Sequence, residues 1–381
     1  MTAAFWCPRR SFLRRFGPLA AEFRRRGWRT MVLIPAAPLF PPGPKDDASV
    51  GAIAHEDLVG VVNSAAALLG LCRGTQTRVL FHTGLRWPAV LDEVRAELRF
   101  YDRVRFASMG YHEEEFLHVL ETPDRVRQWD AIFTWDPDAL GIAASRYASI
   151  AVVRDSIQAL GDPMADQVTG DFRARLGVAR DRRLVLYLPA ANAHLLRSRW
   201  LGRWYRRAPW NLPWAPWGDL VPSQRRVAAL VRRYCDRHGA LMLVKERAKS
   251  PAPAWLRRMA DWVIGDDSFC PSTLLGAMRA ADLVVGLAGG WAVEALMAER
   301  TTLSILPYPQ SAYEHPLLLP IRERLYDTRW AWRVDAFLTH GWDWLEEWAA
   351  VGSWSPSRLP SPETFRPGAS ARIVTAVERL T

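Results

Sequence analysis

The fold of this chain is constrained most by an alternation of short apolar segments with helical patterns, which occurs in two successive runs. The first run begins with an apolar segment at 2–7, a helical pattern at 11–26 and a second apolar segment at 30–35. The second run begins at 184–188 and continues at 241–244. Two strands joined by a helical crossover are parallel, and their apolar sides are covered by the helices. The sequence therefore predicts two Rossmann-like α/β domains, each built on a parallel sheet.

The remaining expected elements extend both runs. Further strands are expected at 78–82, 104–108, 131–134, 150–153, 261–264, 283–286 and 302–305. Further helices are expected at 56–72, 88–98, after 113, and at 164–176, 223–238, 252–261, 272–280, 291–298 and 365–381. Gly161-Asp162-Pro163 breaks the pattern between the runs. We therefore expect domains at 1–160 and 161–340, followed by a segment at 341–381 that contains the last helix.

The composition is that of a globular protein without a membrane span. Of the 381 residues, 49% are hydrophobic and 24% are charged. No apolar run approaches the ~18 residues of a membrane helix, and the N-terminus lacks the apolar stretch of a signal peptide. The four cysteines are scattered without Cys-x-x-Cys spacing, which favours a reducing cytoplasm over a disulfide framework or a zinc site. The Walker A, His-Glu-x-x-His and Gly-x-Ser-x-Gly motifs are absent, which excludes the enzyme classes that depend on them.

A cluster of cations follows the apolar segment at 241–244. Lys245, Arg247 and Lys249 are close together there, in a chain whose formal net charge is +10. Parallel α/β sheets bind ligands at the carboxyl ends of their strands, and lysine and arginine can hold a diphosphate at such an edge. The segment therefore predicts a phosphate-binding loop. The alternative is a solvated basic loop.

A second candidate site is the turn between the segment at 283–286 and the helix expected at 291–298. Gly289 and Gly290 would let a phosphate approach the backbone N–H groups at the helix N-terminus. Glu294 could then accept hydrogen bonds from ribose hydroxyls. The spacing differs from the Gly-x-Gly-x-x-Gly fingerprint of dinucleotide-binding proteins. The alternative is a tight turn, with Glu294 as a solvated helix residue.

Four segments together carry a resemblance to a known group of proteins. Gly161–Asp166 resembles a Gly-x-Pro-x-x-Asp turn at a domain junction, and Arg183–Pro189 resembles the first strand of a nucleotide-binding domain. Val244–Arg247 resembles a strand followed by Lys-x-His-Pro, and Ala281–Ala295 resembles a nucleotide-binding turn that ends in Glu-Ala. The chain thus resembles glycosyltransferases of the twin-Rossmann (GT-B) type, especially bacterial surface-polysaccharide enzymes and their CDP-glycerol glycerophosphotransferase and sugar epimerase relatives.

The resemblance implies an N-terminal acceptor domain and a C-terminal nucleotide-sugar-binding domain that face each other across a cleft. The last helix would return to the N-terminal domain. The expected reaction is transfer of a sugar from a nucleotide sugar to an acceptor hydroxyl, in the synthesis of a cell-surface polysaccharide or glycolipid. Glycerophosphate transfer, epimerisation and a non-catalytic binding or scaffolding role are the alternatives. Two departures leave the donor open: Arg247 replaces the usual histidine, and Ala288–Trp291 replaces a serine-rich turn.

The resemblance places the catalytic base in the N-terminal domain. His82 ends an expected strand at the carboxyl edge of the sheet, where a general base could act. Glu114, in the run that starts at His112, is a second candidate. The alternatives are a packed structural histidine and an acidic helix N-terminus that complements the helix dipole.

No metal or other cofactor is expected. Asp136-Pro137-Asp138 matches the Asp-x-Asp metal motif of the other glycosyltransferase fold. It also fits a helix start, with Asp136 as the N-cap and Pro137 in the first turn. If lysine and arginine hold the diphosphate, no metal is required.

The segment at 197–217 combines five arginines with five tryptophans and three prolines, and it contains no acidic residue. Tryptophan favours the membrane interface, and arginine is attracted to anionic lipid. We therefore expect a cytoplasmic protein that rests on the inner leaflet of the membrane, beside a lipid-linked acceptor. A local tryptophan core, a subunit interface and a nucleic-acid surface are the alternatives, the last being the weakest. The expected membrane or acceptor contacts are Trp200, Arg203, Trp204, Trp210 and Trp214.

Overall fold

In the computed structural model the chain packs into two compact units. The first comprises Met1–Val168, Phe269–Pro271 and Ser361–Thr381, and the second comprises Thr169–Ser268 and Ser272–Pro360. The domain boundaries inferred from the sequence stay predictions. The structure describes residues 1–8, 10–36, 58–83, 89–109, 129–134, 157–189, 217–246, 251–265, 268–287, 291–306, 331–351 and 367–381.

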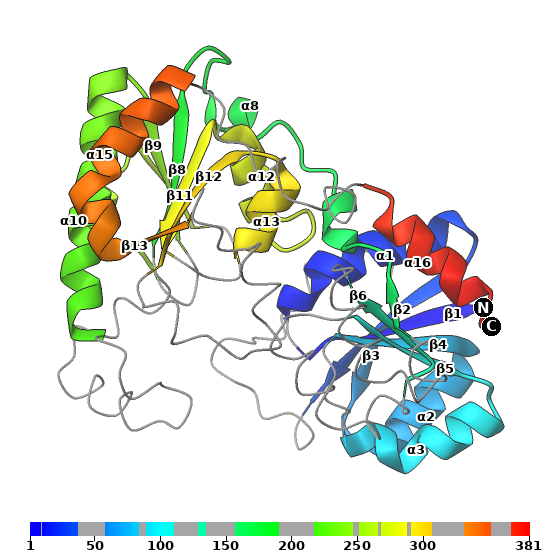
Figure 1. Ribbon diagram of the computed structural model, residues 1–381. Coiled ribbons are helices and arrows are strands. Elements are labelled where there is room, and N and C mark those ends of the chain that lie inside the picture. The colour runs from blue at the N-terminus through cyan, green and yellow to red at the C-terminus, as the bar shows by residue number, and fades with distance from the viewer. Residues whose placement is uncertain are drawn as a thin grey trace, which may run out of the picture. The chain divides into compact units, whose positions relative to one another are not determined.

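The first unit is built on a seven-stranded parallel sheet, in the order β3-β2-β1-β4-β5-β6-β7 (Figure 1). Every neighbouring pair is parallel, as the strand–helix–strand pattern predicts. The strands are β1 (Thr2–Trp6), β2 (Arg29–Pro35), β3 (Leu58–Val62), β4 (Thr77–Thr83), β5 (Arg105–Met109), β6 (Ala131–Thr134) and β7 (Ile157–Ala159).

Aromatic side chains form the core between this sheet and helix α1 (Leu13–Arg25). Phe16 and Phe23 lie on the buried face of α1, and Phe5 and Phe81 project from β1 and β4 toward them. The ring centroids of Phe5 and Phe16 are 5.1 Å apart, and those of Phe5 and Phe81 are 5.3 Å apart. Helices α2 (Ala65–Gly74) and α3 (Ala89–Phe100) cover the opposite face of the sheet (Figure 1).

Two expected helices were wrong in part. The region predicted as a helix at 56–72 contains strand β3 before α2, because three valines favour the extended backbone and Ser64 then caps α2. The helix expected at 164–176 is divided into a 3-10 turn, η2 (Pro163–Asp166), and α8 (Phe172–Leu176). Each has its own aspartate N-cap, so two starts replace one continuous helix.

The second unit is built on a six-stranded sheet in the order β10-β9-β8-β11-β12-β13, again parallel throughout (Figure 1). Its helices are α8, α10 (Trp217–His238), α11 (Ala254–Met259), α12 (Thr273–Ala280), α13 (Trp291–Ala298) and α15 (Val334–Val351). Its strands are β8 (Leu184–Leu188), β9 (Leu241–Lys245), β10 (Trp262–Ile264), β11 (Leu283–Leu287), β12 (Thr301–Leu306) and β13 (Ala331–Arg333).

Besides β3, the sequence-based prediction missed β7, β13 and α15. Strand β13 has three residues and runs directly into α15, so no turn residue separates them. The expected helix after 113 and the expected strand at 150–153 lie outside the described residues. Among the described helices, none has the combination of length and apolar character that a membrane span requires.

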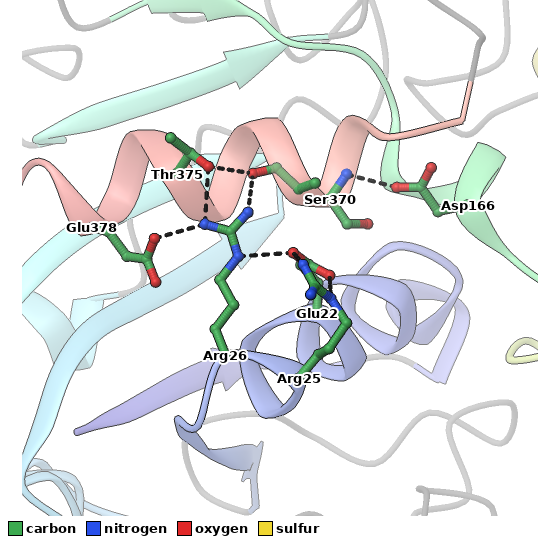
Figure 2. Close-up of polar contacts among 8 residues, drawn as sticks. Glu22, Arg25, Arg26, Asp166, Ser370, Thr375 and Glu378 are labelled. Atoms are coloured by element: carbon green, nitrogen blue, oxygen red, sulfur yellow. Dashed lines mark hydrogen bonds and ion pairs between the residues drawn. The ribbon is translucent and has the colours of Figure 1, made fainter.

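Helix α16 (Ala369–Glu378), near the end of the sequence, packs within the first unit. Ile373, Val374 and Val377 are fully buried in the same core as Phe5 and Phe81. Polar contacts hold both ends of the helix (Figure 2). The carboxylate of Asp166 accepts hydrogen bonds from the backbone N–H groups of Gly368 and Ser370 at the N-terminal end.

Arg26, next to the end of α1, contacts the side of α16. Its guanidinium donates hydrogen bonds to the Ala371 carbonyl at 2.9 Å and to the Thr375 hydroxyl at 2.9 Å. It also pairs with Glu378 at 2.6 Å and with Glu22 of α1 at 2.8 Å (Figure 2). Burial therefore attaches this late segment to the core of the first sheet, and hydrogen bonds attach it to Arg26 and Asp166.

Candidate functional site

Three of the predicted site residues lie in the described part of the chain: Lys245, Glu294 and His82. The positions of the others stay predictions. Those outside the described residues are Glu114, Arg247, Lys249, Gly289, Gly290, Trp200, Arg203, Trp204, Trp210 and Trp214.

Strand pairing places Lys245 and the β11–α13 connection at one edge of the second sheet. Val244 pairs with Tyr187 of β8, so Lys245 lies one step further toward the carboxyl end of β9. Gly286 of β11 pairs with Leu188 of β8 on one side and with Ser304 of β12 on the other. Lys245, Gly286 and Ser304 therefore lie at the same level near the carboxyl edge of one sheet, with β8 between the strands of Lys245 and Gly286. Parallel α/β sheets bind ligands at this edge.

Lys245 is the last residue of β9 and is only 6% exposed. Its ammonium donates a hydrogen bond to the backbone carbonyl of Glu246. A buried ammonium needs such partners, because burial otherwise disfavours the charge. The cation is thus held at the edge of the sheet by the first residue of the following loop, and it differs from a solvated surface lysine.

Trp291, the first residue of α13, covers the end of β11. A Cβ atom at Gly286 would lie 2.7 Å from Cζ2 of Trp291 and 2.9 Å from Cβ of Leu188. The Trp291 indole donates a hydrogen bond to the Leu287 carbonyl at 2.7 Å, which holds the ring in this place. Sequence reasoning included both residues in the turn but missed that Gly286 makes room for the ring. A glycine five residues before a tryptophan was the available signal.

Glu294 lies one turn into α13 and is 1% exposed. It is therefore not the solvated helix residue of the alternative interpretation. Ser304, on β12, is also fully buried, and its hydroxyl has no hydrogen-bond partner among the residues that the structure describes. The polar side chains of Glu294 and Ser304 are thus both buried in the second unit.

His82 lies on β4, next to Trp6 of β1 and Ser108 of β5 in the strand register. It is 7% exposed, and its ring stacks with Trp129 at a centroid distance of 5.9 Å and an interplanar angle of 22°. The residue is close to the carboxyl edge of the first sheet and is packed against an aromatic ring. Its role as a base stays a prediction.

The thiols of Cys72 and Cys235 are not set up for nucleophilic chemistry. Burial raises the pKa of each to about 12, so both remain protonated near neutral pH. Across the described ranges, no three histidine, cysteine, aspartate or glutamate side chains gather as metal ligands.

Sequence comparison finds no match, either to a protein-family model or to a curated protein. Comparison with solved structures does. A protein from Listeria monocytogenes named as a UDP-N-acetylglucosamine 2-epimerase superposes with a TM-score of 0.62 at 12% identity, over 99% of this chain and 95% of the other.

Two further structures of different activity are similar over the whole chain. The glycotransferase of kitacinnamycin has a TM-score of 0.56 at 13% identity and covers 100% of this chain and 98% of its own. The wall teichoic acid polymerase TagF has a TM-score of 0.57 at 9% identity and covers 100% and 88%. These similarities, together with the two parallel sheets, show that the chain has the GT-B fold. At such low identity they show the fold alone.

Proposed function

We propose that the protein is a glycosyltransferase that moves a sugar from a nucleotide sugar to an acceptor hydroxyl, in cell-surface polysaccharide or glycolipid synthesis. One observation carries the proposal. Lys245 and the connection from β11 to α13, with the buried Glu294, occur at the same edge of one parallel sheet. A cation and a helix N-terminus at that edge suit a diphosphate.

Each residue has a role in this proposal. Lys245 contributes a point charge to the diphosphate, with Arg247 and Lys249 from the following loop. Gly289 and Gly290 allow phosphate oxygens to approach the N-terminus of α13. Glu294 accepts hydrogen bonds from the ribose hydroxyls. Since the cations balance the phosphate charge, the reaction needs no metal, and full activity in excess chelator is the expected result.

The names of the similar structures support a nucleotide-sugar substrate. One is named for UDP-N-acetylglucosamine, a second is called a glycotransferase, and a third is a polymerase of wall teichoic acid. The first and third also favour the second candidate, an epimerase or a glycerophosphotransferase of the same fold. Product analysis separates the candidates, because an epimerase changes the nucleotide sugar without any acceptor.

The acceptor side of the proposal depends on residues of the first unit and on the tryptophan-rich segment. We propose His82 as the base that takes the acceptor proton, with Glu114 as the second candidate. We further propose that the segment at 197–217 rests on the cytoplasmic face of the membrane and places a lipid-linked acceptor near the enzyme.

Nucleotide binding tests the donor site. Lys245→Ala should weaken binding of the matching nucleotide diphosphate by ~1–3 kcal/mol, the range for loss of a charge-assisted hydrogen bond. Isothermal titration with UDP, GDP and CDP measures the effect, with Arg225→Ala, an exposed arginine of α10, as the control. Unchanged affinity in both Lys245→Ala and Glu294→Ala would refute this site.

Liposome sedimentation tests the membrane contact. Replacing Trp200, Trp204, Trp210 and Trp214 with serine should reduce binding to anionic vesicles, provided that circular dichroism shows a folded variant. Equal sedimentation of the variant and the wild type, or no binding of the wild type at low salt, would contradict a membrane role. Binding to single-stranded nucleic acid that falls steeply with salt would instead favour the nucleic-acid alternative.

A further inference from the structure

A closed ring of hydrogen bonds surrounds the carboxylate of Glu246, the residue directly after Lys245. The backbone N–H of Ala252 donates to one carboxylate oxygen at 2.7 Å. Nη2 of Arg257, on α11, donates to both oxygens at 2.7 Å. Nε of the same arginine donates to the Ala252 carbonyl at 3.1 Å, which closes the ring. We call these three residues the Glu246 ring.

The Glu246 ring is built onto the sheet. The Glu246 backbone N–H donates to the Ile264 carbonyl of β10 at 3.1 Å. A Cβ atom at Gly265 would lie 3.1 Å from Oε1 of Glu246, so a glycine at this position gives the carboxylate its space. Ala252 then ties the far side of the loop to the same carboxylate. Glu246 and Ala252, which flank the cationic sequence in the chain, are therefore fixed to each other, and Glu246 is fixed to the sheet.

The charges of the ring matter for an anion site. An unpaired carboxylate next to Lys245 would repel phosphate and attract the ammonium. Arg257 neutralises Glu246, so the pair adds no net charge to the loop. The Glu246 carbonyl also accepts the hydrogen bond from Lys245. Glu246 thus contacts both Lys245, the proposed phosphate-binding cation, and Ala252.

We propose that Glu246 is a positioning residue for the donor diphosphate. Its carboxylate holds Ala252 and Arg257, which follow the cationic sequence in the chain, and its carbonyl orients the ammonium of Lys245. This inference rests on the proposed nucleotide site. The Arg257 side chain is 49% exposed, so its ion pair contributes little to global stability, and the effect of the ring is on binding geometry.

The sign of one substitution separates positioning from charge. Glu246→Gln removes a negative charge beside the phosphates, so electrostatics alone would strengthen nucleotide binding. Positioning has the opposite sign, because glutamine replaces one of the two oxygens that accept from Arg257 with an NH2 group, which cannot accept that hydrogen bond and leaves no ion pair. We expect the affinity for the matching nucleotide diphosphate to fall by about 5- to 20-fold in Glu246→Gln and in Arg257→Met. The double variant should lose no more nucleotide affinity than the single variant that binds more weakly, since either change opens the ring.

The experiment is isothermal titration of the full chain with UDP, CDP and GDP, combined with hydrogen exchange at the Ala252 amide. Asp236→Asn is the control, because it breaks an exposed ion pair with Arg232 in the same unit. In the ring variants we expect weaker binding, faster exchange at Ala252 and a melting temperature close to that of the control.

Equal or tighter nucleotide binding by Glu246→Gln, or unchanged hydrogen exchange at the Ala252 amide, would overturn the positioning role. If the wild type still binds a nucleotide in that case, the proposed nucleotide site is not contradicted. No binding of any of the three nucleotides by the wild type would overturn both.

Discussion

The carboxyl edges of the two sheets hold their ionisable side chains in different ways. In the first unit, His82 is packed beside Trp129, with Trp6 and Ser108 on the adjacent strands. In the second unit, Lys245 is hydrogen-bonded to the loop that follows it. The histidine ring stacks on an aromatic side chain, whereas the ammonium donates a hydrogen bond that a phosphate can supplement or replace. We therefore propose the second edge as the one that receives an anion.

The largest expected effect tests whether the first edge has a chemical role at all. His82→Ala should lower turnover by ~10²–10⁴-fold if His82 is the general base. His82→Phe is the matched variant, because it keeps a ring against Trp129 but cannot accept a proton. Steady-state turnover of both, with near-ultraviolet circular dichroism to verify folding, provides the measurement. If either variant keeps more than about a tenth of wild-type turnover, the histidine is a packing residue.

The next effect sharpens the contrast at the second edge. Gly286→Ala places a methyl group 2.7 Å from the Trp291 ring, and Leu188 blocks the other side. Such overpacking should destabilise the protein by ~1–3 kcal/mol and shift the start of α13. Urea unfolding and nucleotide titration measure the two consequences. Gly170→Ala is the control, because a Cβ there has no neighbour within 4 Å. Wild-type stability in Gly286→Ala would show that the Trp291 ring does not depend on the glycine.

A smaller effect distinguishes two carboxylates that both accept backbone hydrogen bonds. Asp166→Asn replaces one of the two carboxylate oxygens that accept backbone hydrogen bonds from Gly368 and Ser370, and should cost about 1 kcal/mol of stability, the typical net value of one hydrogen bond. Nucleotide affinity should be unchanged, in contrast to Glu246→Gln. Thermal denaturation measures the change in stability, and titration of the same preparations measures the nucleotide affinity. A loss of affinity in Asp166→Asn would remove the distinction between a stabilising and a positioning carboxylate.

The smallest effect concerns Ser304, beside Gly286 on β12. Its hydroxyl is fully buried without a hydrogen-bond partner in the described part of the chain. Ser304→Ala should therefore change stability by less than about 0.5 kcal/mol or increase it slightly, because an unsatisfied polar group is removed. Urea denaturation gives the value. A destabilisation above about 1 kcal/mol would reveal a hydrogen bond made by this hydroxyl.

Much of the fold could be predicted because its strands have a strong local signal. The segments at 184–188 and 283–287 are uninterrupted apolar runs, as in strands that are covered on both faces. Strand β3 was missed, and the helix expected at 56–72 was wrong in its first part, because the valines adjoin an alanine- and leucine-rich helix start and the boundary depends on one serine cap. Strand β13 was missed because three residues are too few to show a period.

The candidate site was predictable in its residue types and in the sheet edge that carries Lys245, but not in its contacts. The order of apolar runs placed Lys245 at a carboxyl edge, which follows from parallel topology. The ring joins Glu246, which follows β9, to Arg257 of α11, 11 positions later in the chain, and no local sequence pattern predicts such a pairing. Likewise, nothing in the vicinity of His82 in the sequence indicated Trp129, which comes from a different strand region. Contacts of this kind depend on the assembled sheet.

The placement of α16 has a consequence for synthesis of the protein. The strands of the first unit leave the ribosome early, but Ile373, Val374 and Val377 complete their core and follow the whole second unit in the chain. The core of the first unit is therefore incomplete until α16, which ends at Glu378, has been synthesised. A premature stop codon before α16 would consequently damage the half of the protein that was made first.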